Sequence, residues 1–194
     1  MFGNIAHSKG KVRWIIVAVG VISVCQCFGL WTKAKKSGMS AQPGLYSINH
    51  FIDGDTISVN MNGGAQSIRL IGVDTAETHK PNTPVQCYGE AAAAFTKQTI
   101  GSGRVRLVAD SESDNRDVYG RLVRYVYLVD GRNLDELLIQ NGYGFAYLYF
   151  PFTRSAQFAT DQTKAQEQHK GLWGACQPYQ ESDGRWQTET AAPT

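Results

Sequence analysis

Residues 51–78 read FIDGDTISVNMNGGAQSIRLIGVDTAET and contain the clearest strand pattern of this 194-residue chain. Residues 57–61 alternate apolar and polar side chains, as a half-buried strand does. Asn62-Gly63-Gly64 indicates a hairpin turn, because asparagine and glycine accept positive φ angles. Residues 67–74 then return as the partner strand. The stretch therefore predicts an antiparallel hairpin with acidic residues at its open end.

Further elements lie on both sides of this hairpin. We predict strands at 45–52, 104–109 and 122–129, and helices at 89–100, 133–138 and 154–170. The first helix is Ala-rich, and Asn133 is the expected N-cap of the second. Five short strands with a helix after the third have the order of an OB-fold. The predicted class is therefore α+β, mainly β: a five-stranded OB-fold barrel with three helices, preceded by one N-terminal hydrophobic helix.

The composition excludes several classes of protein. The chain has 42% hydrophobic and 19% charged residues, with a mean hydropathy of −0.29. These values exclude a polytopic membrane protein, an acidic disordered chain and a low-complexity fibre. Residues 1–40 hold six basic and no acidic side chains, which leaves 13 basic and 17 acidic ones elsewhere, a net charge of −4. The rest of the chain must therefore bind any phosphate through a local site.

An apolar segment precedes the predicted barrel. Residues 14–31 read WIIVAVGVISVCQCFGLW, carry no charge and would span about 27 Å as a helix, close to the thickness of a bilayer core. A tryptophan at each end favours an uncleaved single-pass anchor, and a secretory signal peptide is the alternative. We therefore expect an exported protein of the cell envelope, either membrane-anchored or, after cleavage, secreted or periplasmic.

The expected organisation has five parts. They are a basic segment (1–13), the apolar segment (14–31), a linker (32–43), the barrel domain (44–178) and a flexible tail (179–194). We expect the barrel domain to be monomeric.

Acidic residues gather where antiparallel pairing brings two strand ends together. Asp53 and Asp55 precede one hairpin strand, and Asp74 and Glu77 end the other. Carboxylates that share one sheet end repel each other, and a divalent cation removes that cost. Oxygen ligands alone select Ca²⁺ or Mg²⁺. The alternative is that these residues only form turns.

Two arginines favour the metal interpretation. Arg69 lies in the strand that leads to Asp74, and Arg121 begins a later strand. Guanidinium groups match phosphate oxygens, so cation, carboxylates and arginines together indicate a phosphodiester-hydrolysing site, although either arginine alone is more often a surface residue. Arg69 and Asp74 are five residues apart and would lie on opposite faces of a straight strand. The strand must therefore bend, and Gly72 is the expected place.

The sequence resembles the staphylococcal nuclease (thermonuclease) family over roughly residues 45–175. The matching stretches are FIDGDTISV (51–59), IRLIGVDTAET (68–78), CYGEAAAAFTKQTI (87–100), RDVYGRLVRYVYL (116–128), NLDELLIQNGYGFAYLY (133–149) and GLW (171–173). The resemblance implies an OB-fold barrel with three helices and cleavage of DNA and RNA at the P–O5′ bond, which leaves 3′-phosphates.

The resemblance also implies a role for individual residues. Ca²⁺ would be bound by the carboxylates of Asp55 and Asp74 and the backbone carbonyl of Thr75. Glu77 would be the general base, and Arg69 and Arg121 would bind the phosphate and stabilise the transition state. Nucleotide contacts fall on Tyr119, Tyr147 and Tyr149, for which packing at the barrel rim is the alternative. Ala76 departs from the family's proline, so we expect a looser loop at Glu77. Val118 departs from the staphylococcal lysine and the net charge beyond residue 40 is −4, so we expect weaker binding to long nucleic acids.

Cys87 and Cys176 are the only cysteines of the predicted barrel domain. In an oxidising compartment they can form a disulfide, which a cysteine pair in exported relatives supports; two reduced cysteines are the alternative. For the whole chain, the alternatives to a nuclease are an inactive OB-fold module that binds nucleic acid or protein at the envelope, and a membrane-tethered interaction protein that depends on residues 1–43.

Overall fold

The computed structural model describes residues 44–78 and 84–191. The predicted hydrophobic helix at 14–31, with the basic segment and the linker that flank it, lies outside these residues. Within the two described ranges, no helix has the length and apolarity needed to cross a membrane.

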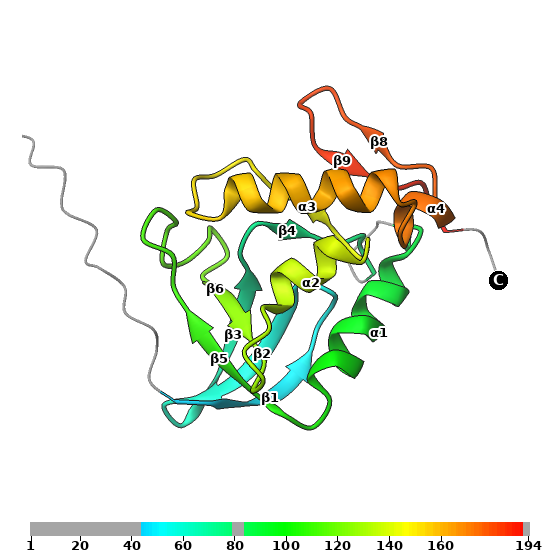
Figure 1. Cartoon of the computed structure of the whole chain (residues 1–194). Helices are drawn as coiled ribbons and strands as arrows, with labels where there is room; N and C mark the ends of the chain where they lie inside the picture. Colours follow the sequence, from blue (N-terminus) through cyan, green and yellow to red (C-terminus); the bar gives the residue numbers. More distant parts are fainter. Residues whose placement is uncertain (1–43, 79–83, 192–194) are drawn as a thin grey trace, which may run out of the picture. The chain divides into compact units, whose positions relative to one another are not determined.

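The predicted five-stranded barrel is confirmed, and its strands close in the order β1-β2-β3-β6-β5 (Figure 1). These strands are β1 (Tyr46–Phe51), β2 (Thr56–Met61), β3 (Gly64–Leu70), β5 (Arg104–Val108) and β6 (Leu122–Tyr127). β3 and β6 pair in parallel and the other neighbours are antiparallel. The β2–β3 hairpin turns at Asn62 and Gly63, whose φ angles are 53° and 80°, as the sequence predicts.

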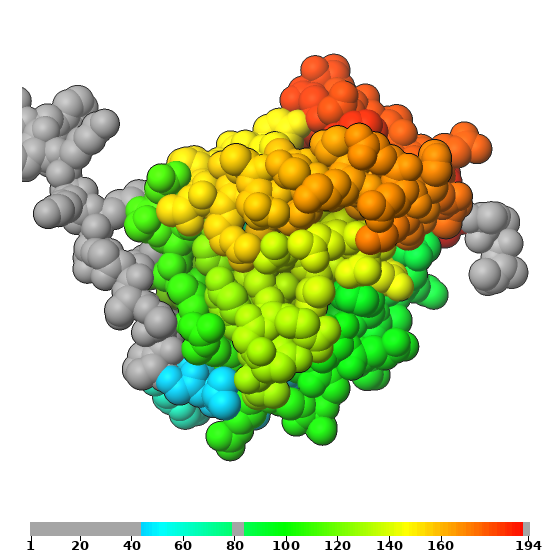
Figure 2. Space-filling model, viewed as in Figure 1, coloured from blue at the N-terminus to red at the C-terminus, as the bar shows by residue number. Residues whose placement is uncertain are grey.

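The three predicted helices are also present, and they cover one side of the barrel. They are α1 (Gly89–Ile100), α2 (Leu134–Gln140) and α3 (Ser155–Glu167), followed by the short α4 (Leu172–Ala175). The side chain of Asn133 caps α2 by accepting the N–H of Glu136 at 2.8 Å. α2 packs between α1 and α3, and in Figure 2 the side chains of the three helices form a closed surface over this face.

A sharp bend at Gly72 separates β3 from β4 (Val73–Asp74). Gly72 has a φ of +67°, and β4 leaves the barrel to pair with β7 (Phe145–Ala146). The bend lets Arg69 and Asp74 face each other, as the spacing of the two residues requires. A Cβ atom at Gly72 would lie 2.5 Å from the ring of Phe152, so both the backbone angle and the packing exclude a side chain here.

Asp135 joins α2 to the barrel from inside the core. Its side chain is fully buried and accepts the N–H of Ile71 at 2.8 Å and the N–H of Val126 at 2.9 Å. Burial raises the pKa of this carboxyl group to about 8. Asp135 thus satisfies two buried backbone donors, one of them beside the Gly72 bend.

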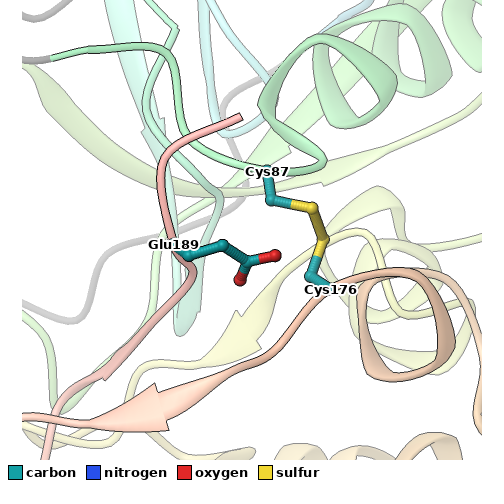
Figure 3. Close-up of side chains that lie close together, drawn as sticks. All are labelled: Cys87, Cys176 and Glu189. Carbon is teal, nitrogen blue, oxygen red and sulfur yellow. A yellow bond between two sulfur atoms is a disulfide. The ribbon is translucent and has the colours of Figure 1, made fainter. Parts of the chain in front are cut away.

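The C-terminal residues form a hairpin where the sequence pattern indicates only a tail. β8 (Tyr179–Gln180) and β9 (Trp186–Gln187) pair antiparallel, and Thr188 beyond them is buried. Cys87 and Cys176 form a disulfide just before the hairpin, with Glu189 beside it (Figure 3). Cys87 N–H donates to the Glu189 carbonyl at 2.8 Å. Apolar periodicity is absent here because polar contacts and single aromatic residues hold the hairpin.

Replacement of Gly72 by alanine should destabilise the protein by about 2–4 kcal/mol, because it adds left-handed backbone strain to overpacking against Phe152. Gly63→Ala is the matched control, since its φ is also positive but its Cβ would meet no atom within 4 Å. Urea unfolding of both variants measures the difference. Equal losses would show that the Phe152 ring imposes no constraint.

Asp135 should make stability depend on pH. The folded chain keeps the Asp135 proton up to about pH 8, whereas the unfolded chain loses it near pH 4, so this contribution is largest at low pH and declines between these values. The unfolding free energy of the wild type minus that of Asp135→Asn should fall by up to about 1.4 kcal/mol per pH unit from about pH 5 to about pH 8. A difference that does not change with pH would contradict the raised pKa.

Candidate active site

A cleft of about 470 Å³ opens beside β4 and β7 and receives most of the predicted site residues. Seven of the nine predicted catalytic, metal-binding and nucleotide-contacting residues line it: Arg69, Asp74, Thr75, Glu77, Tyr119, Arg121 and Tyr147. Asp55 is buried immediately behind Arg69 and Thr75. Tyr149 packs against Tyr147, with ring centroids 5.0 Å apart, and is 49% exposed.

The guanidinium of Arg69 joins the two predicted metal-binding aspartates. Its Nη1 lies 2.8 Å from Asp55 Oδ2 and its Nη2 lies 2.7 Å from Asp74 Oδ1. Nη1 also donates to the carbonyl of Val73 at 2.8 Å, which fixes the plane of the guanidinium. The two carboxylates therefore lie within reach of one positive charge, as the pairing of the hairpin ends predicts.

Burial dominates the electrostatics of this cluster. It raises the pKa of Asp74 to about 6, although Arg69 and, more weakly, Arg185 act in the opposite direction. Burial and the neighbouring Asp55 raise the pKa of Asp53 to about 7. Burial alone would lower the pKa of Arg69, but Asp55 and Asp74 outweigh it and the pKa is raised. The site thus holds more acid than one guanidinium neutralises.

Asp55 is positioned by several hydrogen bonds besides its ion pair. Its Oδ2 accepts the backbone N–H of Thr75 at 2.8 Å and the Thr75 hydroxyl at 3.1 Å. Its Oδ1 accepts the hydroxyl of Thr56 at 2.9 Å. The bonds with Thr75 connect the chain just before β2 to the chain just after β4, and they position the Asp55 carboxylate next to the residue that follows Asp74.

Arg121, the residue just before β6, reaches the same cluster. Asp117 accepts its backbone N–H at 2.9 Å and its Nε–H at 2.6 Å. Arg121 Nη1 donates to Thr56 Oγ1 at 3.2 Å, and the ring of Tyr119 lies 5.3 Å from the guanidinium carbon. Asp117 therefore directs Arg121 toward the threonine that also contacts Asp55.

Glu77 is fixed through its backbone by Gln86. The N–H of Glu77 donates to Gln86 Oε1 at 2.7 Å, and the carbonyl of Glu77 accepts the N–H of Gln86 at 2.9 Å. Gln86 Nε2 in turn donates to Gln187 of β9 at 2.7 Å. The Glu77 side chain is left facing the cleft.

The chemistry of these donors fits a hard divalent cation. Asp55 and Asp74 offer carboxylate oxygens and Thr75 a carbonyl oxygen, and oxygen is the type of ligand that Ca²⁺ prefers. Two carboxylates and one carbonyl would leave coordination positions for water or phosphate oxygens. Among the described residues, the one group of three potential ligands within 4.8 Å is Cys87, Cys176 and Glu189, and its sulfur atoms are already joined in a disulfide (Figure 3).

Several residues of the cleft were not predicted from the sequence. Asp117 and Gln86 act by orienting Arg121 and Glu77, and Arg185 and Trp186 enter the cleft from the C-terminal hairpin. Neither Gln86 nor Arg185 stands in a local pattern that distinguishes it from a surface residue. The turn Asp117-Val118-Tyr119-Gly120 before Arg121 was the one available signal, because an aspartate in a turn can accept nearby backbone N–H groups.

Comparisons with known proteins find relatives that are named as nucleases. The thermonuclease of Staphylococcus hyicus is 38% identical over 162 residues, which cover 82% of this chain and 94% of that protein. Endonuclease YncB of Bacillus subtilis is 43% identical over 129 residues, and the SPbeta prophage-derived endonuclease YokF of the same organism is 41% identical over 129 residues. These matches span 60% and 43% of the two Bacillus proteins, respectively.

The family match covers more than half of the chain. Residues 67–175, from β3 to the end of α4, match the family described as Staphylococcal nuclease homologue. The chain therefore belongs to the staphylococcal nuclease family.

Proposed function

We propose that this chain is a Ca²⁺-dependent endonuclease that hydrolyses phosphodiester bonds of DNA and RNA and leaves 3′-phosphates. The observation that carries the proposal is the contact of one guanidinium, that of Arg69, with the carboxylates of both Asp55 and Asp74, at a cleft that Glu77 and Arg121 also line. Relatives that are named as endonucleases and thermonucleases support this class of activity.

The proposed roles follow from the positions of the side chains. Asp55 and Asp74, with the Thr75 carbonyl, would hold the cation, which when bound orients the substrate and offsets charge on the phosphate. Glu77 takes a proton from a water molecule, whose oxygen bonds to phosphorus as the P–O5′ bond breaks. The departing 5′ oxygen takes up a proton from solvent.

The arginines stabilise the charge that develops on the phosphate. Arg69 and Arg121 donate hydrogen bonds to its oxygen atoms, and both guanidinium groups are already oriented by carboxylates before the substrate binds. Tyr119 and Tyr149 are 81% and 49% exposed, which suits contact with nucleotides, and Tyr147 lines the cleft and packs on Tyr149. The substrate is thus held by a local site.

We also propose that the protein is exported. A disulfide between Cys87 and Cys176 suits an oxidising compartment. The apolar segment at 14–31 would act as a membrane anchor or a cleaved signal, and it lies outside the described residues.

The nuclease activity should depend on Ca²⁺ and on Glu77. The full chain should cleave denatured DNA with Ca²⁺, stop when a chelator is added, and leave ends that a 3′-phosphatase can process. Glu77→Gln should lower kcat by about 10²–10⁴-fold, because glutamine cannot accept the proton from water. The measurement is the initial rate in each condition. Equal and negligible cleavage in every sample would favour the inactive binding module instead.

Lysine should not substitute for Arg121. Arg121→Lys keeps the charge but loses the planar pair of donors, so kcat/KM should fall by about 10²–10³-fold. Arg104→Lys, at the exposed start of β5, is the control and should leave kcat/KM unchanged. Near-full activity of Arg121→Lys would count against the proposed role of the guanidinium.

A further inference from the structure

The C-terminal hairpin adds an arginine to the cleft. The family match ends at residue 175, whereas β8 and β9 lie at 179–187. Arg185, at the end of the hairpin turn, lines the same cleft as Arg69, Glu77 and Arg121. The hairpin is therefore a part of this chain, beyond the matched region, that borders the proposed active site.

The hairpin is held firmly against the active-site strands. The ring of Trp186 stacks on Phe145, with centroids 6.1 Å apart, and meets Trp173 edge-on at 5.1 Å. Phe145 is the direct β-sheet partner of Asp74. Gln187 receives a hydrogen bond from Gln86 at 2.7 Å. Arg185 therefore stands next to a residue that packs on the partner of Asp74.

The guanidinium of Arg185 is oriented in the same way as that of Arg121. Asp183 accepts the backbone N–H of Arg185 at 3.0 Å and its Nε–H at 2.7 Å, as Asp117 does for Arg121 at 2.9 and 2.6 Å. Glu181 lies 3.6 Å from Nη2. Because Asp183 and Glu181 offset the charge of Arg185, its contact with a phosphate would depend on close, charge-assisted hydrogen bonds.

A hydrogen-bonded pair of an aspartate and an arginine in a turn is not by itself a sign of function. Asp130-Gly131-Arg132 repeats the Asp183-Gly184-Arg185 turn, with the Asp130 carboxylate 3.0 Å from the Arg132 N–H and 2.8 Å from its Nε. Arg132 is 58% exposed and lies outside the cleft. The two arginines differ in their place relative to the cleft and in the additional Glu181 near Arg185, and they share the contact with an aspartate two residues earlier, so Arg132 is an internal control for that contact.

The two tyrosines Tyr147 and Tyr149 indicate the path of a nucleic acid strand near Arg185. A Cβ atom on Gly184 would lie 3.1 Å from the hydroxyl of Tyr149, so the hairpin turn touches this tyrosine. Tyr149 packs on Tyr147, which lines the cleft. A nucleic acid strand that runs from the cleft over these two rings therefore passes the Arg185 guanidinium, with one phosphate in each nucleotide.

We propose that Arg185 binds the phosphate next to the scissile one, on the Tyr147–Tyr149 side of the cleft. The proposal rests on the nuclease function proposed above. It adds to that function a second phosphate subsite, supplied by the C-terminal hairpin.

The test compares Arg185→Gln with Arg132→Gln in the full chain, with Ca²⁺ and a single-stranded oligodeoxynucleotide. Arg185→Gln should raise KM about tenfold, leave kcat nearly unchanged and reduce the slope of log KM against log salt by about one. Arg132→Gln should match the wild type. Both substitutions remove the same turn contact, and the additional pair of Arg185 with Glu181 is exposed and contributes little, so thermal unfolding should be nearly equal for the two variants.

A dinucleoside monophosphate, which has only the scissile phosphate, completes the test. On this substrate the wild type and Arg185→Gln should have the same kcat/KM, because the second phosphate is absent. An unchanged KM on the oligonucleotide, or an equal loss on both substrates, would overturn the proposal. No cleavage by the wild type would contradict the nuclease function instead, and fluorescence anisotropy of oligonucleotide binding would then test Arg185 alone, with binding equal to that of Arg132→Gln as the negative result.

Discussion

The ion pairs of Arg69 with Asp55 and Asp74 are the constraint around which the active-site end of the barrel is arranged. Bringing two carboxylates together in a largely buried place is unfavourable unless positive charge and hydrogen bonds compensate them. Arg69 supplies the charge, and Thr75 supplies the hydrogen bonds to Asp55. The acid that one guanidinium leaves unbalanced is the physical reason for the proposed cation, whose charge would compensate it.

The fold makes this arrangement possible at Gly72. A straight strand would place Arg69 and Asp74 on opposite faces, and the left-handed backbone at Gly72 turns the chain between them. Ile71, the residue before the bend, donates its backbone N–H to the buried carboxyl group of Asp135. The hydrogen bond from Ile71 to Asp135 and the side chains of Arg69, Asp74 and Thr75 thus belong to one segment, residues 69–75, so the backbone connects Asp135 to the geometry at Asp74.

Local rules in the sequence predicted the barrel, the Asn62-Gly63 turn, the Asn133 cap and the need for a bend at Gly72, because each depends on φ preferences or on periodicity within a few residues. The proximity of the acidic residues at the open end of the hairpin was predictable too, since antiparallel pairing brings the two strand ends together. Gln86 and Arg185 were not, because their roles arise from contacts between segments about 10 to 110 residues apart. No local pattern distinguishes such residues from solvated ones.

The two Asp-Gly-Arg turns show why local sequence cannot assign function to an arginine. Both turns use the same pair of hydrogen bonds from arginine to aspartate, so the local free energy that holds each guanidinium is similar. What differs is the tertiary anchor: Trp186 and the disulfide at Cys176 place the second turn at the cleft, whereas the first caps the β6–α2 connection. The same kind of turn can therefore contribute to phosphate binding when tertiary contacts, here those of Trp186 and the disulfide, place it beside a site, without any change in the hydrogen bonds of the turn itself.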